Sequence, residues 1–227
     1  MRNMIVLNGP PGCGKDEAAK MIMEMFSGTD HNLVAKQHMN KSSIIRIACS
    51  IIGITVEEFM DGYFDLTEDR SLKEREHAIR MESLTGKRYR RYKEVPLYQI
   101  DKNWYSKRTL LIHVSEIVVK PYFGEDAFGH IFANTIPECD LVVVPDSGFP
   151  DELKPSIELL GAENIAVVKI FREGYDFEET EGQEKDSRRY LEREDFDYKL
   201  MFCEVQNVEG DLSVLRGQLE TVLANFL

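Results

Sequence analysis

The stretch Met4-Ile5-Val6-Leu7-Asn8-Gly9-Pro10-Pro11-Gly12-Cys13-Gly14-Lys15-Asp16 decides how this chain folds. Residues 4–8 form a short apolar run that is typical of a buried strand, and the run ends at a turn rich in Gly and Pro. An Ala- and Met-rich segment from Lys15 to about Phe26 follows and has the composition of a helix. We therefore expect a strand, a glycine-rich loop and a helix in that order.

Residues 9–15 fit the spacing GxxxxGK in the context that this pattern requires, directly after an apolar strand and before a helix. Glycines let successive backbone N–H groups turn inward around a phosphate, and the helix N-terminus adds roughly half a positive charge. Lys15 adds a full charge for the β- and γ-phosphates. An ordinary turn is the alternative, but the spacing favours a loop that binds ATP through Gly9, Pro10, Pro11, Gly12, Cys13, Gly14, Lys15, Asp16 and Glu17.

The residue after the lysine departs from the common pattern, which has Ser or Thr there to hold Mg²⁺. A carboxylate about 4 Å from a phosphate charge costs roughly 4 kcal/mol at an effective dielectric of about 20. Asp16 therefore suits this position only if it faces the metal or its waters, or points away. Two readings stay open: Asp16 holds the hydration shell of Mg²⁺, or it is an acid that favours the helix N-terminus.

A second acidic residue stands at the end of another apolar run, Leu141-Val142-Val143-Val144-Pro145-Asp146. In open α/β sheets the ligand lies beyond the carboxyl ends of the strands, so Asp146 is expected to face the same site as Lys15. There it would coordinate Mg²⁺ or accept a proton. An Asp that merely opens the turn at 146–148 is the alternative, because acids are common in turns.

The rest of the chain alternates short apolar runs with amphipathic segments. Strands are expected at 33–35, 139–146, 165–171 and 198–205, and helices at 42–52, 55–64, 109–119, 126–136, 151–160 and 212–227. Lys120-Pro121 is expected to end the 109–119 helix, and residues 65–103 to form a helix and an exposed loop. This alternation predicts an α/β fold with a roughly five-stranded parallel sheet and helices on both faces.

Composition and net charge limit the kinds of partner and the cellular compartment that we expect for this chain. The 227 residues carry 40 acids and 28 bases, a net charge of −12 that repels polyanions, so nucleic acid is a disfavoured partner. The longest apolar runs, about four or five residues, are far below the roughly 20 needed to span a bilayer, so no membrane is expected. The four cysteines include no CxxC pair, which favours a reducing cytoplasm. A homodimer stays open.

The chain resembles phage-type deoxynucleoside monophosphate kinases and the related phosphomevalonate kinases. The Gly-Lys-Asp version of the loop is the most specific point of similarity. Other blocks occur in the same order over most of the chain: Arg108-Thr-Leu-Leu-Ile-His-Val-Ser-Glu116, Lys120-Pro-Tyr-Phe-Gly124, Asp146-Ser-Gly-Phe-Pro-Asp-Glu152 and Asp186-Ser-Arg188-Arg-Tyr-Leu191. Two departures concern metal and acceptor binding: Glu17 stands where Thr or Ser is frequent, and Gly148 where some members have Arg.

The resemblance implies one three-layer P-loop kinase domain over 1–227, with a helical acceptor-binding region at about 38–136 and a lid at about 172–197. It implies ATP with Mg²⁺ as donor, a deoxynucleoside monophosphate as acceptor, and a host cytoplasm if the chain is phage-encoded. Phosphoryl transfer needs several cations. Arg108 is expected to bind the acceptor phosphate, Arg172 ends a strand where a ligand-facing residue belongs, and Arg188 is expected to neutralise the transition state.

Alternatives remain for Arg108, for Arg188 and for the reaction. An exposed arginine at the start of a helix is an equally good interpretation of Arg108. The composition around Arg188 is also typical of a charged surface loop. The patch Lys87-Arg88-Tyr89-Arg90-Arg91-Tyr92-Lys93 keeps open a kinase acting on a modified pyrimidine in DNA. Another phosphorylated metabolite is a further acceptor. A non-catalytic P-loop module that binds nucleotide is the alternative from a different class.

Overall fold

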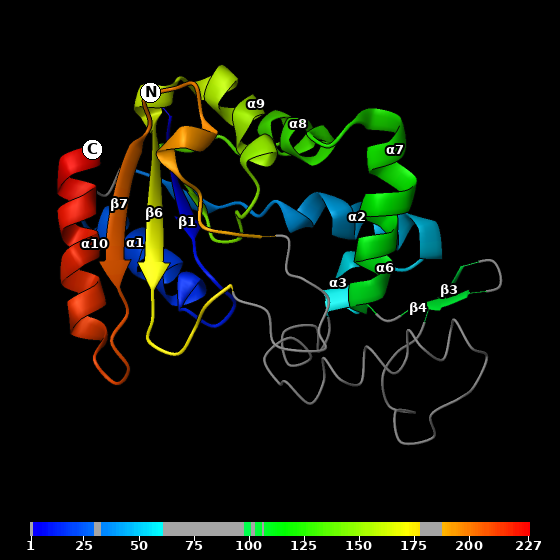
Figure 1. Ribbon diagram of the computed structural model, residues 1–227, viewed down its shortest axis with the longest axis horizontal. Coiled ribbons are helices and arrows are strands. Elements are labelled where there is room, and N and C mark those ends of the chain that lie inside the picture. Colours follow the sequence, from blue (N-terminus) through cyan, green and yellow to red (C-terminus); the bar gives the residue numbers. More distant parts are fainter. Residues whose placement is uncertain (1, 30–32, 61–97, 101–102, 106, 178–187) are drawn as a thin grey trace. The chain divides into compact units, whose positions relative to one another are not determined.

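The computed structural model describes residues 2–29, 33–60, 98–100, 103–105, 107–177 and 188–227 (Figure 1). The chain divides into two compact units. The first comprises Met1–Asn40 and Asp126–Leu227, and the second comprises Lys41–Glu125. The glycine-rich loop at 9–15 and Asp146 belong to the first unit.

A five-stranded sheet forms the centre of the first unit. Its strands are β1 (Asn3–Asn8), β2 (Ala35–Gln37), β5 (Leu141–Val144), β6 (Ile165–Phe171) and β7 (Met201–Gln206), in the spatial order β2-β5-β1-β6-β7. All neighbouring strands run parallel, which confirms the predicted α/β class with a parallel sheet. Strand β1 lies in the middle, so Met4 to Leu7 are fully buried.

Helices cover both faces of this sheet (Figure 1). Alternate strand residues such as Ile5 and Leu7 pack with α1 (Lys15–Thr29) and α10 (Leu212–Phe226). The residues between them, such as Met4 and Val6, pack with α8 (Ala127–Asn134), α9 (Pro150–Leu160) and the buried Leu191. Two short 3₁₀ turns, η3 (Ala162–Asn164) and η4 (Arg193–Asp195), complete this unit. Two apolar layers thus hold the sheet and its carboxyl edge in place.

Strand β2 begins two residues later than the expected 33–35. Val34 N donates to Asp140 Oδ2 at 2.8 Å, and Val34 O accepts from the backbone N of Asp140 at 2.9 Å. These bonds fix residue 34 in front of β5, so the parallel ladder begins only with Ala35 opposite Leu141. The other predicted strands overlap the observed ones, at 3–8, 141–144, 165–171 and 201–206.

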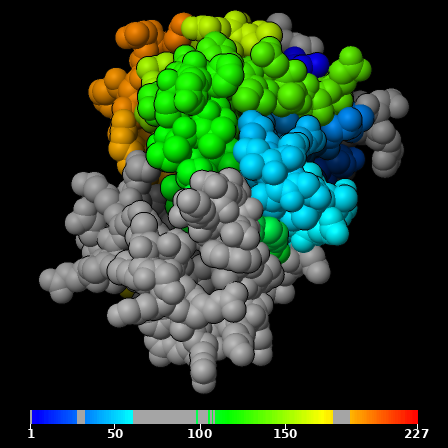
Figure 2. Space-filling model, turned by 90° about the vertical axis from the view of Figure 1, so that its right-hand side faces the viewer, coloured from blue at the N-terminus to red at the C-terminus, as the bar shows by residue number. Residues whose placement is uncertain are grey.

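The second unit is mostly helical where it is described. Its elements are α2 (Lys41–Ile52), α3 (Val56–Met60), the antiparallel strands β3 (Tyr98–Ile100) and β4 (Asn103–Tyr105), α6 (Lys107–His113), the π-helical segment η2 (Val114–Val119) and α7 (Lys120–Phe123). Figure 2 shows the run α6–η2–α7 in green beside α2 and α3 in blue and cyan. The expected capping box opens α3, with Thr55 N bonded to Glu58 and Glu58 N to Thr55.

One expectation for this unit is wrong, and a second differs from the structure in the few residues that are described. Lys120-Pro121 does not end the helical run: the N–H of Lys120 donates to Ser115 O at the end of η2, and α7 continues directly to Phe123 with proline in its first turn, a position where proline is tolerated. Within 65–103, where a helix and an exposed loop were expected, the described residues 98–100 and 103 belong to the strands β3 and β4. Residues 61–97, which include the basic patch 87–93, lie outside the described residues.

None of the described helices is long and apolar enough to cross a membrane. All four cysteines carry free thiols, so the fold of the described residues is held by packing and hydrogen bonds without disulfides.

Candidate functional site

The loop at 9–15 lies at the carboxyl edge of the sheet, where the connections of two neighbouring strands diverge. From β1 the chain passes through α1 to β2, which is the strand at one edge of the sheet. From the adjacent β6 it continues to β7, which is the strand at the opposite edge. Such a divergence leaves a crevice beyond the strand ends, which is where ligands bind in open α/β sheets. The predicted phosphate loop therefore occupies the expected place.

Two glycines give this loop its turn. Gly12 has φ +80° and Gly14 has φ +100°, in the left-handed region that favours glycine. Between them, Cys13 N donates to Pro10 O at 3.3 Å, and the first bond of α1 runs from Ala18 N to Gly14 O at 2.9 Å. The N–H groups at the start of α1 consequently have no acceptor within the helix. They can bind an anion together with the positive end of the helix dipole.

Lys15 closes the loop on itself. Its Nζ donates to the carbonyl oxygens of Gly9 and Pro10, both at 2.7 Å. Burial lowers the pKa of the Lys15 ammonium below its ordinary value, and the positive charge of Arg188 also lowers it, against the opposing effects of Cys13 and Asp16. Lys15 is thus a partly desolvated cation at the mouth of the loop, which strengthens its attraction for a phosphate oxygen.

Residues from the ends of β6 and β7 brace this loop. Arg172 Nη1 donates to Gly12 O at 3.1 Å, and the Arg172 guanidinium stacks 4.5 Å from the ring centre of Tyr175. The Tyr175 ring covers Gly12 so closely that a Cβ atom there would lie 2.6 Å from it. The buried Asn207 donates from Nδ2 to Cys13 O at 2.8 Å and also crowds Gly14. The positive φ therefore favours glycine at both positions, and an added Cβ would also displace the Tyr175 ring or the Asn207 amide.

Replacing Asn207 by alanine is expected to loosen the loop without unfolding the chain. The variant loses the bond to Cys13 O and leaves a buried carbonyl without that donor, which costs about 1–3 kcal/mol. Urea unfolding measures this loss, and calorimetric titration with ATP is expected to give about tenfold weaker binding through misplacement of the loop amides. Val208→Ala, at the exposed neighbouring position that follows Asn207, is the control. Unchanged stability and ATP affinity in Asn207→Ala would contradict the bracing role.

The acidic residues lie as follows. Asp146 comes two residues after β5, at the same carboxyl edge as the loop, and its Oδ1 accepts from Asn40 N at 2.9 Å. Asp16 is exposed in the first turn of α1, and Glu17 pairs with Lys20 at 3.7 Å. Mg²⁺ is usually bound by one or two carboxylates plus substrate phosphates, and the oxygen donors of Asp146 and Asp16 fit that chemistry. Among the described residues, no three Asp, Glu, His or Cys side chains gather as a ready-made metal site.

The segment 188–196 is tied to the carboxyl edge of the sheet. Asn8, the last residue of β1, donates from Nδ2 to Arg189 O at 3.1 Å and accepts from Leu191 N at 2.8 Å. Lys169 of β6 pairs with Glu192 at 2.7 Å. The predicted lid at 172–197 is described only at 172–177 and 188–197, so its closure stays a prediction, and residues 178–187 lie outside the described ranges.

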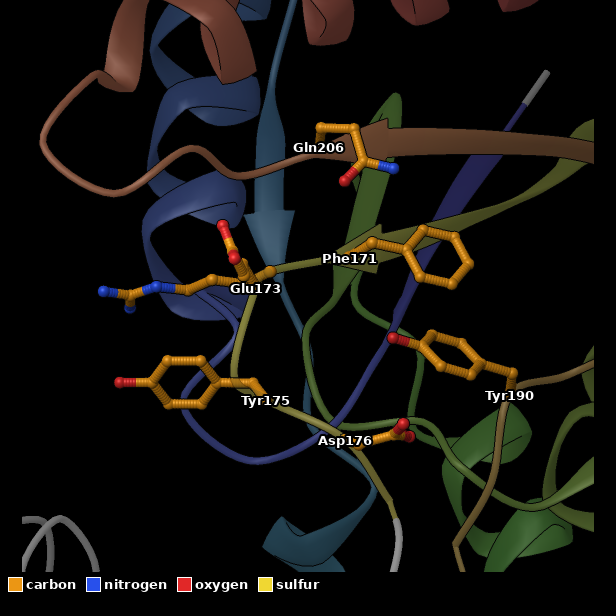
Figure 3. Close-up of a pocket in the computed structure, with 7 residues that line it drawn as sticks. Phe171, Glu173, Tyr175, Asp176, Tyr190 and Gln206 are labelled. Atoms are coloured by element: carbon orange, nitrogen blue, oxygen red, sulfur yellow. The ribbon is translucent and has the colours of Figure 1, made fainter.

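A cavity of about 350 Å³ opens beside the loop (Figure 3). The rings of Phe171 and Tyr190 stack with their centres 4.6 Å apart, and the Asp176 carboxylate points into the same cavity. Burial raises the pKa of Tyr190 to about 12, so its hydroxyl stays protonated and donates to Ile170 O at 3.2 Å. Aromatic walls with acidic acceptors suit a planar group that carries hydrogen-bond donors. Arg172 and Tyr175, which brace the loop, also line this cavity.

The predicted site residues divide between the two units. Lys15, Asp16, Asp146, Arg172 and Arg188 all belong to the unit that holds the loop. Arg108 is the second residue of α6 in the Lys41–Glu125 unit, so its role as acceptor ligand stays a prediction.

Sequence reasoning missed Asn8, Tyr175 and Asn207. Asn8 left a usable signal, since a polar residue that ends a central apolar strand must find partners in the core. Asn207 left none, because its bond to Cys13 O joins residues 194 positions apart.

No protein-family model matches this chain, and a search of curated protein sequences found no match either. The resemblance to deoxynucleoside monophosphate kinases accordingly rests on the quoted motifs alone.

Proposed function

We propose that this chain transfers the γ-phosphoryl group of ATP to a small phosphorylated acceptor, a deoxynucleoside monophosphate by preference. The observation that carries the proposal is the loop at 9–15: its left-handed glycines, the start of α1 and the partly buried Lys15 converge at the carboxyl edge of the central strand. That combination of backbone donors and one desolvated cation is a polyphosphate site.

Other cations near the loop favour a kinase. In the transfer, an oxygen of the acceptor phosphate attacks the γ-phosphorus, a new P–O bond forms, and the bond to the β–γ bridging oxygen breaks to release ADP. Charge on the moving phosphoryl group and on the leaving oxygen must be neutralised. Lys15 would bind the β- and γ-phosphates, and Arg188 would oppose the charge of the transition state.

The remaining groups have roles in binding. Mg²⁺, held by Asp146 and Asp16, would supply Lewis-acid neutralisation of the phosphate oxygens. Arg172 and Asn207 would keep the loop amides in place, as their bonds to Gly12 O and Cys13 O indicate. The base of the donor would stack in the aromatic cavity beside Arg172 and Tyr175.

An activity assay with a set of different phosphate acceptors tests this proposal. The chain is incubated with ATP and Mg²⁺ and, in turn, with the dNMPs, NMPs, phosphomevalonate and DNA that contains hydroxymethyluracil. We expect consumption of ATP with one or a few monophosphates, and formation of the matching diphosphate. Turnover with modified DNA alone would move the acceptor to the polymer. Clear ATP binding without turnover for any of these acceptors would favour a non-catalytic nucleotide-binding module over a kinase.

A further inference from the structure

Gly148, in the loop after β5, contacts the side chain of Arg188. A Cβ atom at position 148 would lie 2.9 Å from Arg188 Cγ, 3.0 Å from its Cβ and 3.2 Å from its Cδ. The aliphatic part of the arginine therefore fills the space that any larger residue at 148 would need. Gly148 is not one of the glycines with positive φ, so alanine suits its backbone and space alone requires glycine.

One amide group holds the backbone on both sides of this contact. Asn8 Nδ2 donates to Ser147 O, next to Gly148, and to Arg189 O, next to Arg188, both at 3.1 Å. Asn8 is 0% exposed. Because a buried amide keeps its hydrogen bonds, Asn8 fixes the distance between the two segments that meet at Gly148 and Arg188.

The contact also keeps a second cation near the loop, because Asn8, whose amide binds Arg189 O, directly precedes Gly9. Arg188 contributes to the lowered pKa of Lys15, after the larger effect of burial. Two like charges repel each other, and their proximity is favourable once an anion lies between them. The packing on Gly148 and the bonds of Asn8 offset that repulsion.

We infer that Gly148 is a positioning residue, which holds Arg188 beside Lys15 so that both cations of the phosphate site are in place before the nucleotide binds. The inference rests on the proposed function and deepens it, since it makes Arg188 a fixed ligand of the donor polyphosphate, whereas an arginine in the predicted lid at 172–197 would reach the site only when that lid closes. A charge that is already in place stabilises developing charge without reorganisation.

A double-mutant cycle on the full chain tests this role. Gly148→Ala, Arg188→Ala and the double variant are titrated with ATP by calorimetry, and their thermal unfolding is followed. We expect Arg188→Ala to weaken ATP binding about ten- to a hundredfold, the equivalent of a lost charged hydrogen bond. Gly148→Ala should weaken it comparably, and the double variant should bind like Arg188→Ala alone, because the arginine is already gone.

The control is Gly217→Ala in α10, where an added Cβ meets no atom within 4 Å and φ is not positive. Removal of Arg188 Cγ and Cδ should also make the double variant at least as stable as Gly148→Ala. Wild-type ATP affinity in Gly148→Ala, or losses that add in the double variant, would overturn the positioning role while leaving the proposed function standing. Failure of the unaltered chain to bind ATP would overturn both.

Discussion

Lys15→Ala is expected to abolish phosphoryl transfer while the chain stays folded. The variant loses the only full charge that the loop at 9–15 itself brings to the donor phosphates. We expect turnover to fall by about a thousandfold or more, as for removal of a preorganised transition-state donor. The free energy of unfolding should change by only about 1 kcal/mol, because the loss of two hydrogen bonds is offset by removal of a partly desolvated ammonium. Steady-state kinetics and urea unfolding measure the two effects.

Lys20→Ala is the matched control for this variant. Lys20 lies further along α1, is exposed, and pairs only weakly with Glu17 at 3.7 Å. Its removal should leave both turnover and stability nearly unchanged. If Lys15→Ala unfolds the chain yet retains activity in the folded fraction, Lys15 is a structural residue and the assignment of the loop is wrong.

Asn8→Asp is expected to give the largest loss of stability among these variants. The amide of Asn8 is fully buried and donates to Ser147 O and Arg189 O, whereas a carboxylate has no proton to donate and would face two carbonyl oxygens. Only the bond from Leu191 N survives the change. An unpaired buried charge costs about 3 kcal/mol or more. Urea unfolding at neutral pH should show this loss, together with weaker ATP binding.

The pH dependence of Asn8→Asp has a definite sign. Burial and the two facing carbonyls raise the folded-state pKa of the introduced carboxyl above that of the unfolded chain. The folded state then takes up a proton more readily, so the loss relative to wild type is greatest above that pKa and shrinks as the pH falls through it. Asn3→Asp, at the less buried start of the same strand, should change little at any pH. A loss that grows on acidification would contradict the buried amide network.

Local sequence determines the sheet and the loop, and these were predictable. The apolar runs of β1 and β5 are continuous because both faces of each strand are buried, and the run of β6 is interrupted by Lys169 alone. The glycines of the loop stand where the turn needs positive φ. The π-helical η2 was not predictable from periodicity, because its Val114–Val119 segment carries the same apolar pattern as the helix before it.

The contacts that complete the site depend on residues far apart in the chain. Asn8 and Arg189 are 181 positions apart, and the packing of Arg188 on Gly148 has no local sequence signal. Gly148 illustrates the difference. In the sequence it stands where some members of the resembled family have arginine, whereas in the fold it leaves the space that the Arg188 side chain occupies. Contacts between such distant residues can be identified only when the strand order β2-β5-β1-β6-β7 is known.

If residues 9–15 bind the phosphates of ATP, the amide resonances of the glycines in this loop report that binding directly. The chain has 15 glycines, so ¹⁵N-glycine labelling gives a simple spectrum, which is assigned by substitution. On titration with ATP we predict large, saturable shifts for Gly9, Gly12 and Gly14, and none for Gly217 in α10. The same shifts should appear with inorganic tripolyphosphate. A spectrum in which the resonances of the three loop glycines do not shift at saturating ATP would contradict phosphate binding by residues 9–15.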